Sequence, residues 1–148
     1  MDTRELIQRA LAARELAYAP YSGFCVGAAL ETAEGEVFTG CNIENSGFSP
    51  TNCAERTAFF KAVSEGRRSF RRIVVVGGVR GPVTGYCAPC GVCRQVMAEF
   101  CDPKTFQILL AKSPEDWRTY TLDELLPLAQ HPEGEQGLDF FRHSTPAG

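Results

Sequence analysis

Three cysteines are spaced so that they could hold one metal ion. Cys53 precedes a segment with helical spacing, while Cys90 and Cys93 lie three residues apart at the start of a second such segment. Residues three apart share one face of a helix, so this pair can converge with Cys53. A catalytic zinc site uses three protein ligands tetrahedrally and leaves its fourth position to water, whose pKa the metal lowers toward neutrality. The pattern therefore predicts Zn²⁺ at the beginnings of two helices.

Glu55 follows Cys53 by two residues and could act on such a water without binding the metal. A carboxylate there can take a proton and pass it to a ring nitrogen and then to a departing amine, provided that its pKa lies near the working pH. Asn52 and Glu55 also have the spacing of a capping box, so Glu55 taken alone favours a helix cap. The cysteine pair downstream favours the catalytic role.

Three thiolates around one Zn²⁺ give a net negative cluster, which weakens the metal as a Lewis acid unless other groups offset the charge. The positive ends of the two helices are candidates for that role, as are Arg56 and Arg94, each of which shortly follows a ligand. We expect Arg56 to donate to the ligand sulfurs. For Arg94, a contact with the site and a solvated position on its helix are equally compatible with the sequence.

Cys87 brings a further sulfur close to the predicted site. The series Cys87-x-x-Cys90-x-x-Cys93 resembles part of an iron–sulfur motif, and Cys87 could also close a four-cysteine zinc site. The iron–sulfur motif lacks its last cysteine, because Cys101 comes too late, and a closed zinc site leaves the neighbouring carboxylate without a role. A thioredoxin-like pair would give Cys53 nothing to do. We therefore expect Cys87 not to be a ligand.

Hydrophobic periodicity and turn residues predict the elements that position these side chains. Helices are expected over 3–17, 53–66 and 90–100, with a small one capped by Thr121 and Glu124, and strands over 24–32, 36–43, 72–79, 105–111 and 118–120. The run 72–79 is apolar and β-branched, which indicates a central strand covered on both faces. A hairpin across Glu34-Gly35, followed by crossover units, favours an α/β fold: a three-layer α/β/α sandwich on one mixed five-stranded sheet.

The 148 residues suffice for one domain with its own core, and we expect that domain over 1–130, followed by a polar tail over 131–148 that is partly docked or flexible. Phe140 and Phe141 are the residues that could dock.

The formal net charge of −3 leaves no positive field for a nucleic acid partner. The N-terminus has neither a signal peptide pattern nor a membrane span, which favours the cytoplasm. Seven cysteines in that reducing compartment favour metal ligands or catalytic thiols, with Cys25 and Cys41 buried in strands.

Zinc deaminases carry a ligand-x-Glu followed downstream by Pro-Cys-x-x-Cys. This chain has Cys53-Ala54-Glu55 and then Pro89-Cys90-Gly91-Val92-Cys93. With the segments YSGFCVGAAL, CNIENSGFSPTNCAERTAFFKAV and PCGVCRQV, the chain resembles the small homotetrameric cytidine deaminases with a three-cysteine zinc site, over about 18–101.

The resemblance implies hydrolytic deamination of cytidine and deoxycytidine to uridine and deoxyuridine with release of ammonia, a reaction of pyrimidine salvage. It implies zinc ligation by Cys53, Cys90 and Cys93, proton transfer by Glu55, and substrate contacts by Phe24, Asn42, Glu44 and Ala54. Asn42 and Glu44 match positions that hydrogen-bond the ribose hydroxyls, and Phe24 matches an aromatic residue of the nucleoside pocket. Without the resemblance, Asn42 is typical of a strand end, Glu44 of a solvated charge and Phe24 of a core.

The resemblance also implies a homotetramer whose active sites are shared through the loop 46–48. The chain departs from the family at two places: Phe48 stands where tyrosine is usual, and 126–130 (LPLAQ) lacks the aromatic of Leu-Pro-x-x-Phe. The alternative functions are deamination of another aminopyrimidine nucleoside, such as a nucleoside antibiotic, and a non-catalytic zinc or iron–sulfur protein.

Overall fold

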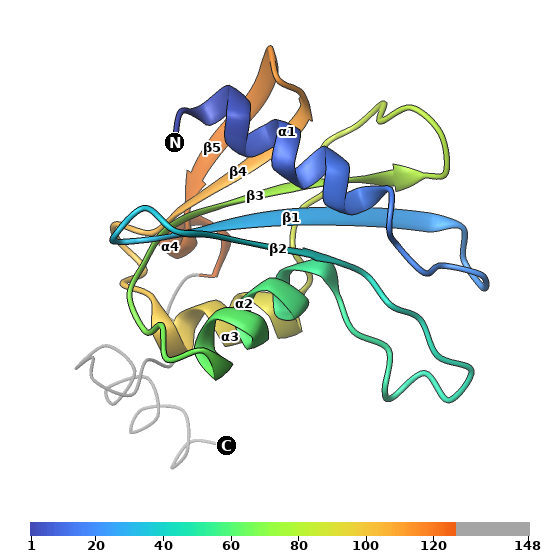
Figure 1. Cartoon of the computed structure of the whole chain (residues 1–148), viewed down its shortest axis with the longest axis horizontal. Helices are drawn as coiled ribbons and strands as arrows, with labels where there is room; N and C mark the ends of the chain where they lie inside the picture. The colour runs from blue at the N-terminus through green and yellow to red at the C-terminus, as the bar shows by residue number, and fades with distance from the viewer. Residues whose placement is uncertain (127–148) are drawn as a thin grey trace, which may run out of the picture.

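A five-stranded sheet in the order β2-β1-β3-β4-β5 separates two layers of helices in this computed structural model, which describes residues 1–126. The elements are α1 (Thr3–Arg14), β1 (Phe24–Thr32), β2 (Val37–Cys41), α2 (Ala54–Ser64), β3 (Phe70–Val79), α3 (Gly91–Phe100), β4 (Gln107–Ser113), β5 (Asp116–Thr121) and α4 (Leu122–Leu125). The β3–β4 pair is parallel and the other pairs are antiparallel, so the sheet is mixed. Helix α1 covers one face while α2 and α3 cover the other (Figure 1), which confirms the predicted three-layer α/β/α sandwich.

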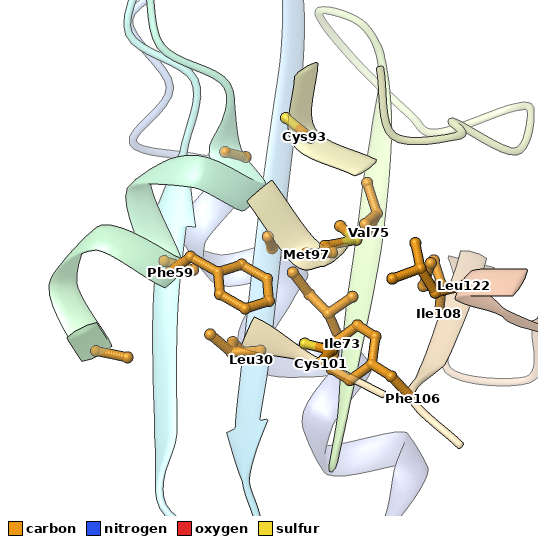
Figure 2. Packing of buried hydrophobic residues seen from close by; sticks show 14 of the residues in the cluster. Leu30, Phe59, Ile73, Val75, Cys93, Met97, Cys101, Phe106, Ile108 and Leu122 are labelled. Carbon is orange, nitrogen blue, oxygen red and sulfur yellow. The ribbon is translucent and has the colours of Figure 1, made fainter. Parts of the chain in front are cut away.

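Side-chain alternation along the strands gives each face its own core. Val74 and Val76 of β3 pack toward α1, whereas Ile73 and Val75 pack toward α2 and α3. Figure 2 shows the larger of the two cores, with Cys93 near one end of it. Strand β3 is therefore central and buried on both faces, as its apolar sequence predicted.

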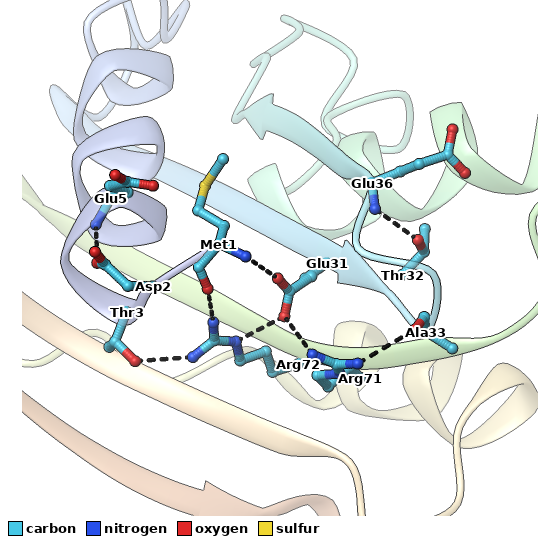
Figure 3. Close-up of polar contacts among 10 residues, drawn as sticks. All are labelled: Met1, Asp2, Thr3, Glu5, Glu31, Thr32, Ala33, Glu36, Arg71 and Arg72. Carbon is cyan, nitrogen blue, oxygen red and sulfur yellow. Dashed lines mark hydrogen bonds and ion pairs between the residues drawn. The ribbon is translucent and has the colours of Figure 1, made fainter.

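A buried carboxylate ties the start of α1 to the sheet. Glu31 is fully buried, and its oxygens accept from Arg72 Nε at 2.9 Å and from the Met1 amine at 3.3 Å. Arg72 also donates to Thr3 Oγ1 at 2.8 Å, and Arg71 Nη1 lies 3.9 Å from Glu31 (Figure 3). Pairing of this kind is what permits an ionised group to be buried.

Several predicted boundaries need correction. The first helix ends at Arg14 instead of residue 17, because Leu16 and Ala17 donate to carbonyls three residues back and so tighten the last turn. The second strand ends at Cys41, and Ile43 forms isolated bridges with Tyr18 and Asn52.

Strands β3 and β5 are each longer than predicted, and β4 is shifted two residues toward the C-terminus. Cys25 is buried as expected, whereas Cys41 is half-buried. Three predictions lie outside the described residues: the division between 1–130 and 131–148, the possible docking of Phe140 and Phe141, and the departure from the family at 127–130. None of the helices formed within residues 1–126 has the length and hydrophobicity needed to cross a bilayer.

Candidate metal centre

The sulfurs of Cys53, Cys90 and Cys93 converge at the beginnings of α2 and α3. Cys53 is the N-cap of α2, Cys90 is the N-cap of α3, and Cys93 lies in the first turn of α3. Cys90 Sγ lies 3.6 Å from Cys53 Sγ and 3.4 Å from Cys93 Sγ, and all three sulfurs lie within 4.8 Å of one another. Tetrahedral Zn–S bonds of about 2.3 Å place sulfurs roughly 3.8 Å apart, so this donor set fits zinc.

The N-terminus of α2 is held against the sheet by backbone and side-chain contacts. Ile43 pairs with Asn52, immediately before Cys53. Thr57 Oγ1 lies 3.1 Å from the carbonyl oxygens of Cys41 and Cys53 and accepts from Asn52 Nδ2 at 3.2 Å. Sequence reasoning missed Thr57. Its hydroxyl group lies one helical turn after the candidate ligand Cys53, and this spacing could have identified it.

The positive end of each helix favours the thiolate form of its cysteines. A hydrogen bond with the Cys93 thiol, followed by the contact with Arg56, lowers the pKa of Cys53 to about 5. The same sulfur–sulfur hydrogen bond raises the pKa of Cys93. These two sulfurs are therefore close enough to influence each other's protonation, as neighbouring ligands of one cation would.

Arg56 lies beside the sulfurs on the first turn of α2. Its Nη2 donates to Cys53 Sγ at 3.2 Å, while its buried Nε has no hydrogen-bond partner among residues 1–126. A guanidinium at this distance offsets part of the negative charge that three thiolates would concentrate.

Glu55 is buried, with 4% of its surface exposed, and does not cap the helix. Cys53 is the N-cap of α2 and makes no side-chain cap hydrogen bond, which removes the capping-box interpretation. Burial raises the pKa of Glu55 to about 7, and the neighbouring Cys53 thiolate acts in the same direction. Such a group can both accept and release a proton near neutral pH.

Two other candidates lie outside the sulfur cluster. Arg94 Nε donates to Pro89 O and Arg94 Nη1 donates to Leu125 O, both at 2.8 Å, so the partners of this half-buried side chain are backbone carbonyls. Cys87 packs against β3, because a Cβ on Gly77 would come within 2.9 Å of its sulfur. Within residues 1–126, the group of side chains able to hold a metal does not include Cys87.

Asn42 and Glu44 lie on either side of Ile43, which pairs with the residue before Cys53. Asn42 Oδ1 accepts from Val26 N and its Nδ2 donates to Phe24 O, both at 2.8 Å. Glu44 accepts from the backbone amides of Tyr21 and Ser22 and from the Ser22 hydroxyl, and the latter holds the pKa of the carboxyl below its usual range. Sequence reasoning missed these partners, because they lie about twenty residues upstream.

The remaining predicted substrate residues differ in exposure. Phe24 is 40% exposed, whereas Ala54 is completely buried in the core beneath α2. Phe48, in the predicted shared loop, is 79% exposed. Among the described residues, Phe48 is the one non-glycine residue with a positive φ, at 60°.

The sequence matches the family model described as "Cytidine and deoxycytidylate deaminase zinc-binding region" over residues 1–109. It is 53% identical to a cytidine deaminase of Sporosarcina psychrophila over 127 residues, which cover 86% of this chain and 90% of the relative. It is 52% identical to a cytidine deaminase of Halalkalibacterium halodurans, again over 127 residues, covering 86% of this chain and 92% of the relative.

Comparison with solved structures gives the same result. The crystal structure of a cytidine deaminase from Burkholderia pseudomallei is 50% identical and superposes with a TM-score of 0.78, covering 87% of this chain and 99% of the other. The three converging sulfurs, the buried carboxylate beside them and these similarities together place this chain in the cytidine deaminase family.

Proposed function

We propose that this protein catalyses the hydrolytic deamination of cytidine and deoxycytidine to uridine and deoxyuridine. The reaction consumes one water, breaks the bond between C4 and the exocyclic nitrogen, and releases ammonia. The observation that supports it most strongly is the buried Glu55 carboxyl beside three sulfurs that fit zinc.

Cys53, Cys90 and Cys93 would hold the metal, and Arg56 would offset the charge of the thiolates by donating to Cys53 Sγ. When bound, zinc lowers the pKa of water and so supplies a nucleophile at neutral pH. Because the N-terminal ends of α2 and α3 also face the sulfurs, the protein stabilises the ligands as thiolates.

Glu55 carries the protons of the reaction. Its carboxylate takes a proton from water, delivers it to N3 of the base and later transfers a proton to the departing amine. A pKa near 7 suits both halves of this transfer, because neither the acid nor the base form is then scarce at neutral pH.

Asn42 and Glu44 bind the ribose, and Phe24 lines the nucleoside pocket. Both polar side chains are already held by backbone groups around 21–26, which orients them before substrate arrives. The methyl group of Ala54 is buried in the core, so this residue would contact substrate through its backbone, between Cys53 and Glu55. Because the family's usual tyrosine is absent at Phe48, the relative turnover of cytidine, deoxycytidine and modified nucleosides should be measured together.

The decisive variant is Glu55→Gln, which keeps the size and burial of the side chain and removes its ability to carry a proton. We expect zinc at about one ion per chain and an unchanged fold, with turnover of cytidine lower by roughly 10² to 10⁴. Ultraviolet absorbance and ammonia release measure turnover. Glu65→Gln, at an exposed position just after α2, is the matched control and should keep full activity. Turnover by Glu55→Gln near that of the control would refute the proton-transfer role.

We also propose a homotetramer with shared active sites, located in the cytoplasm. The exposed aromatic ring of Phe48 and the exposed apolar side chains of Phe60 and Val92 on α2 and α3 support an assembly that covers them. Light scattering on the purified protein tests the assembly, and a monomeric mass at working concentration would contradict it.

A further inference from the structure

The connection between β3 and α3 delivers Cys90 to the metal centre without regular secondary structure. From Pro82 to Pro89, no backbone group forms a hydrogen bond with another backbone group of residues 1–126. Side chains must therefore position this connection. Cys87 packs over Gly77, and Arg94 holds the carbonyl of Pro89, but both contacts lie within three residues of Cys90.

Tyr86 provides a contact with a different part of the sheet. Its hydroxyl donates to Asp116 Oδ1, while Lys112 Nζ and Arg118 Cζ each lie 4.5 Å from the centroid of its ring. Cations at this distance over an aromatic face attract it electrostatically. We call these four residues the Tyr86 clamp.

All three partners of Tyr86 come from the hairpin of β4 and β5, at the edge of the sheet farthest from β2. Arg118 pairs with Leu110 across the hairpin, and Asp116 lies two residues before Arg118 on the same strand. Leu110 belongs to the core beneath α2 and α3, so the clamp lies on the same face of the sheet as the metal centre. Tyr86 lies four positions before Cys90, and its half-buried ring joins the edge hairpin to this core.

We propose that Tyr86 is a positioning residue for the metal centre: the clamp holds the connection 80–90 so that Cys90 meets Cys53 and Cys93. Neither the hydroxyl nor the ring of Tyr86 belongs to the set of metal ligands. This inference rests on the proposed zinc site and extends it to a residue on the far side of Cys87.

The test measures release of zinc from the full-length, zinc-loaded protein into excess chromophoric chelator, well below the unfolding temperature. Groups that orient metal ligands typically change metal affinity by 10-fold to 100-fold. We expect Tyr86→Leu, which loses the hydroxyl and the ring, to release zinc roughly tenfold faster than the parent. Tyr86→Phe keeps the ring over Lys112 and Arg118 and should release it about threefold faster.

Two controls separate positioning from general loss of stability. Ile7→Val removes one buried methyl group from the core on the opposite face of the sheet and should leave the release rate unchanged. Asp116→Ala should reproduce Tyr86→Phe, and the double variant should be no faster than either single one, because each of them removes the same hydrogen bond.

Equal release rates for the parent and Tyr86→Leu would overturn the inference while leaving the proposed function intact. Faster release by Ile7→Val, to the same extent as Tyr86→Leu, would overturn it as well. A parent protein that binds no zinc would instead refute the proposed function, so the two failures are distinguishable.

Discussion

The close approach of α2 to the sheet at Gly40 allows a matched perturbation of the metal centre. A Cβ on Gly40 would lie 2.4 Å from Ala54 O and 2.7 Å from Ala58 N, about 1 Å inside ordinary van der Waals distance. The atoms in the way are backbone atoms of α2, so Gly40→Ala must push back the helix start that carries Cys53 and Glu55. Gly27→Ala meets an even closer obstacle on the other face, where its Cβ would lie 2.1 Å from Ala10 O of α1.

Overpacking of this kind costs about 1–3 kcal/mol of unfolding free energy, and we expect both variants to lose that much in urea unfolding. A displacement of about 1 Å at reacting groups costs on the order of 10²-fold in rate. Gly40→Ala should therefore lose about 10²-fold in kcat/KM for cytidine, whereas folded Gly27→Ala should stay within roughly threefold of the parent. Equal activity of the two variants, both folded under the assay conditions, would refute the claim that Gly40 sets the place of the catalytic groups.

Two further predictions concern acid stability and metal content. Burial would raise the pKa of Glu31, but the hydrogen bond and charge of Arg72, with the Met1 amine, hold it below its usual range. The ionised Glu31 carboxylate therefore contributes its full share of folding stability above its pKa in the unfolded chain, about 4.3. That stability is lost as the pH falls through the lower pKa that Glu31 has in the folded protein. Glu31→Gln should lower the free energy of unfolding by about 3 kcal/mol at pH 7, and it should lose less further stability in acid than the parent does. Urea unfolding at pH 7 and pH 3.5 measures both effects. A variant that loses as much stability between these two pH values as the parent would contradict this. Cys87→Ser should retain about one zinc per chain by metal analysis, because its sulfur lies outside the cluster; loss of zinc would identify Cys87 as a ligand.

The sequence by itself was sufficient to predict a zinc site with three cysteine ligands and a carboxylate beside it. Cys90 and Cys93 share a helix start and Glu55 follows Cys53 by two residues, and such short spacings determine geometry wherever a helix forms. The fold class was equally accessible, since the apolar run of β3 and the hairpin before it are local patterns.

The tertiary structure alone decided which of the nearby groups take part. Cys90 lies 37 positions after Cys53, and only the packing of α2 and α3 on one face of the sheet (Figure 1) brings their sulfurs to 3.6 Å. The same packing turns Arg94 toward two carbonyls, places Cys87 on Gly77 and ties Tyr86 to the edge hairpin. The contacts of Arg94 with Leu125 and of Tyr86 with Asp116 join positions 31 and 30 apart in the chain, so they depend on sheet register and helix packing, which local sequence spacing does not specify.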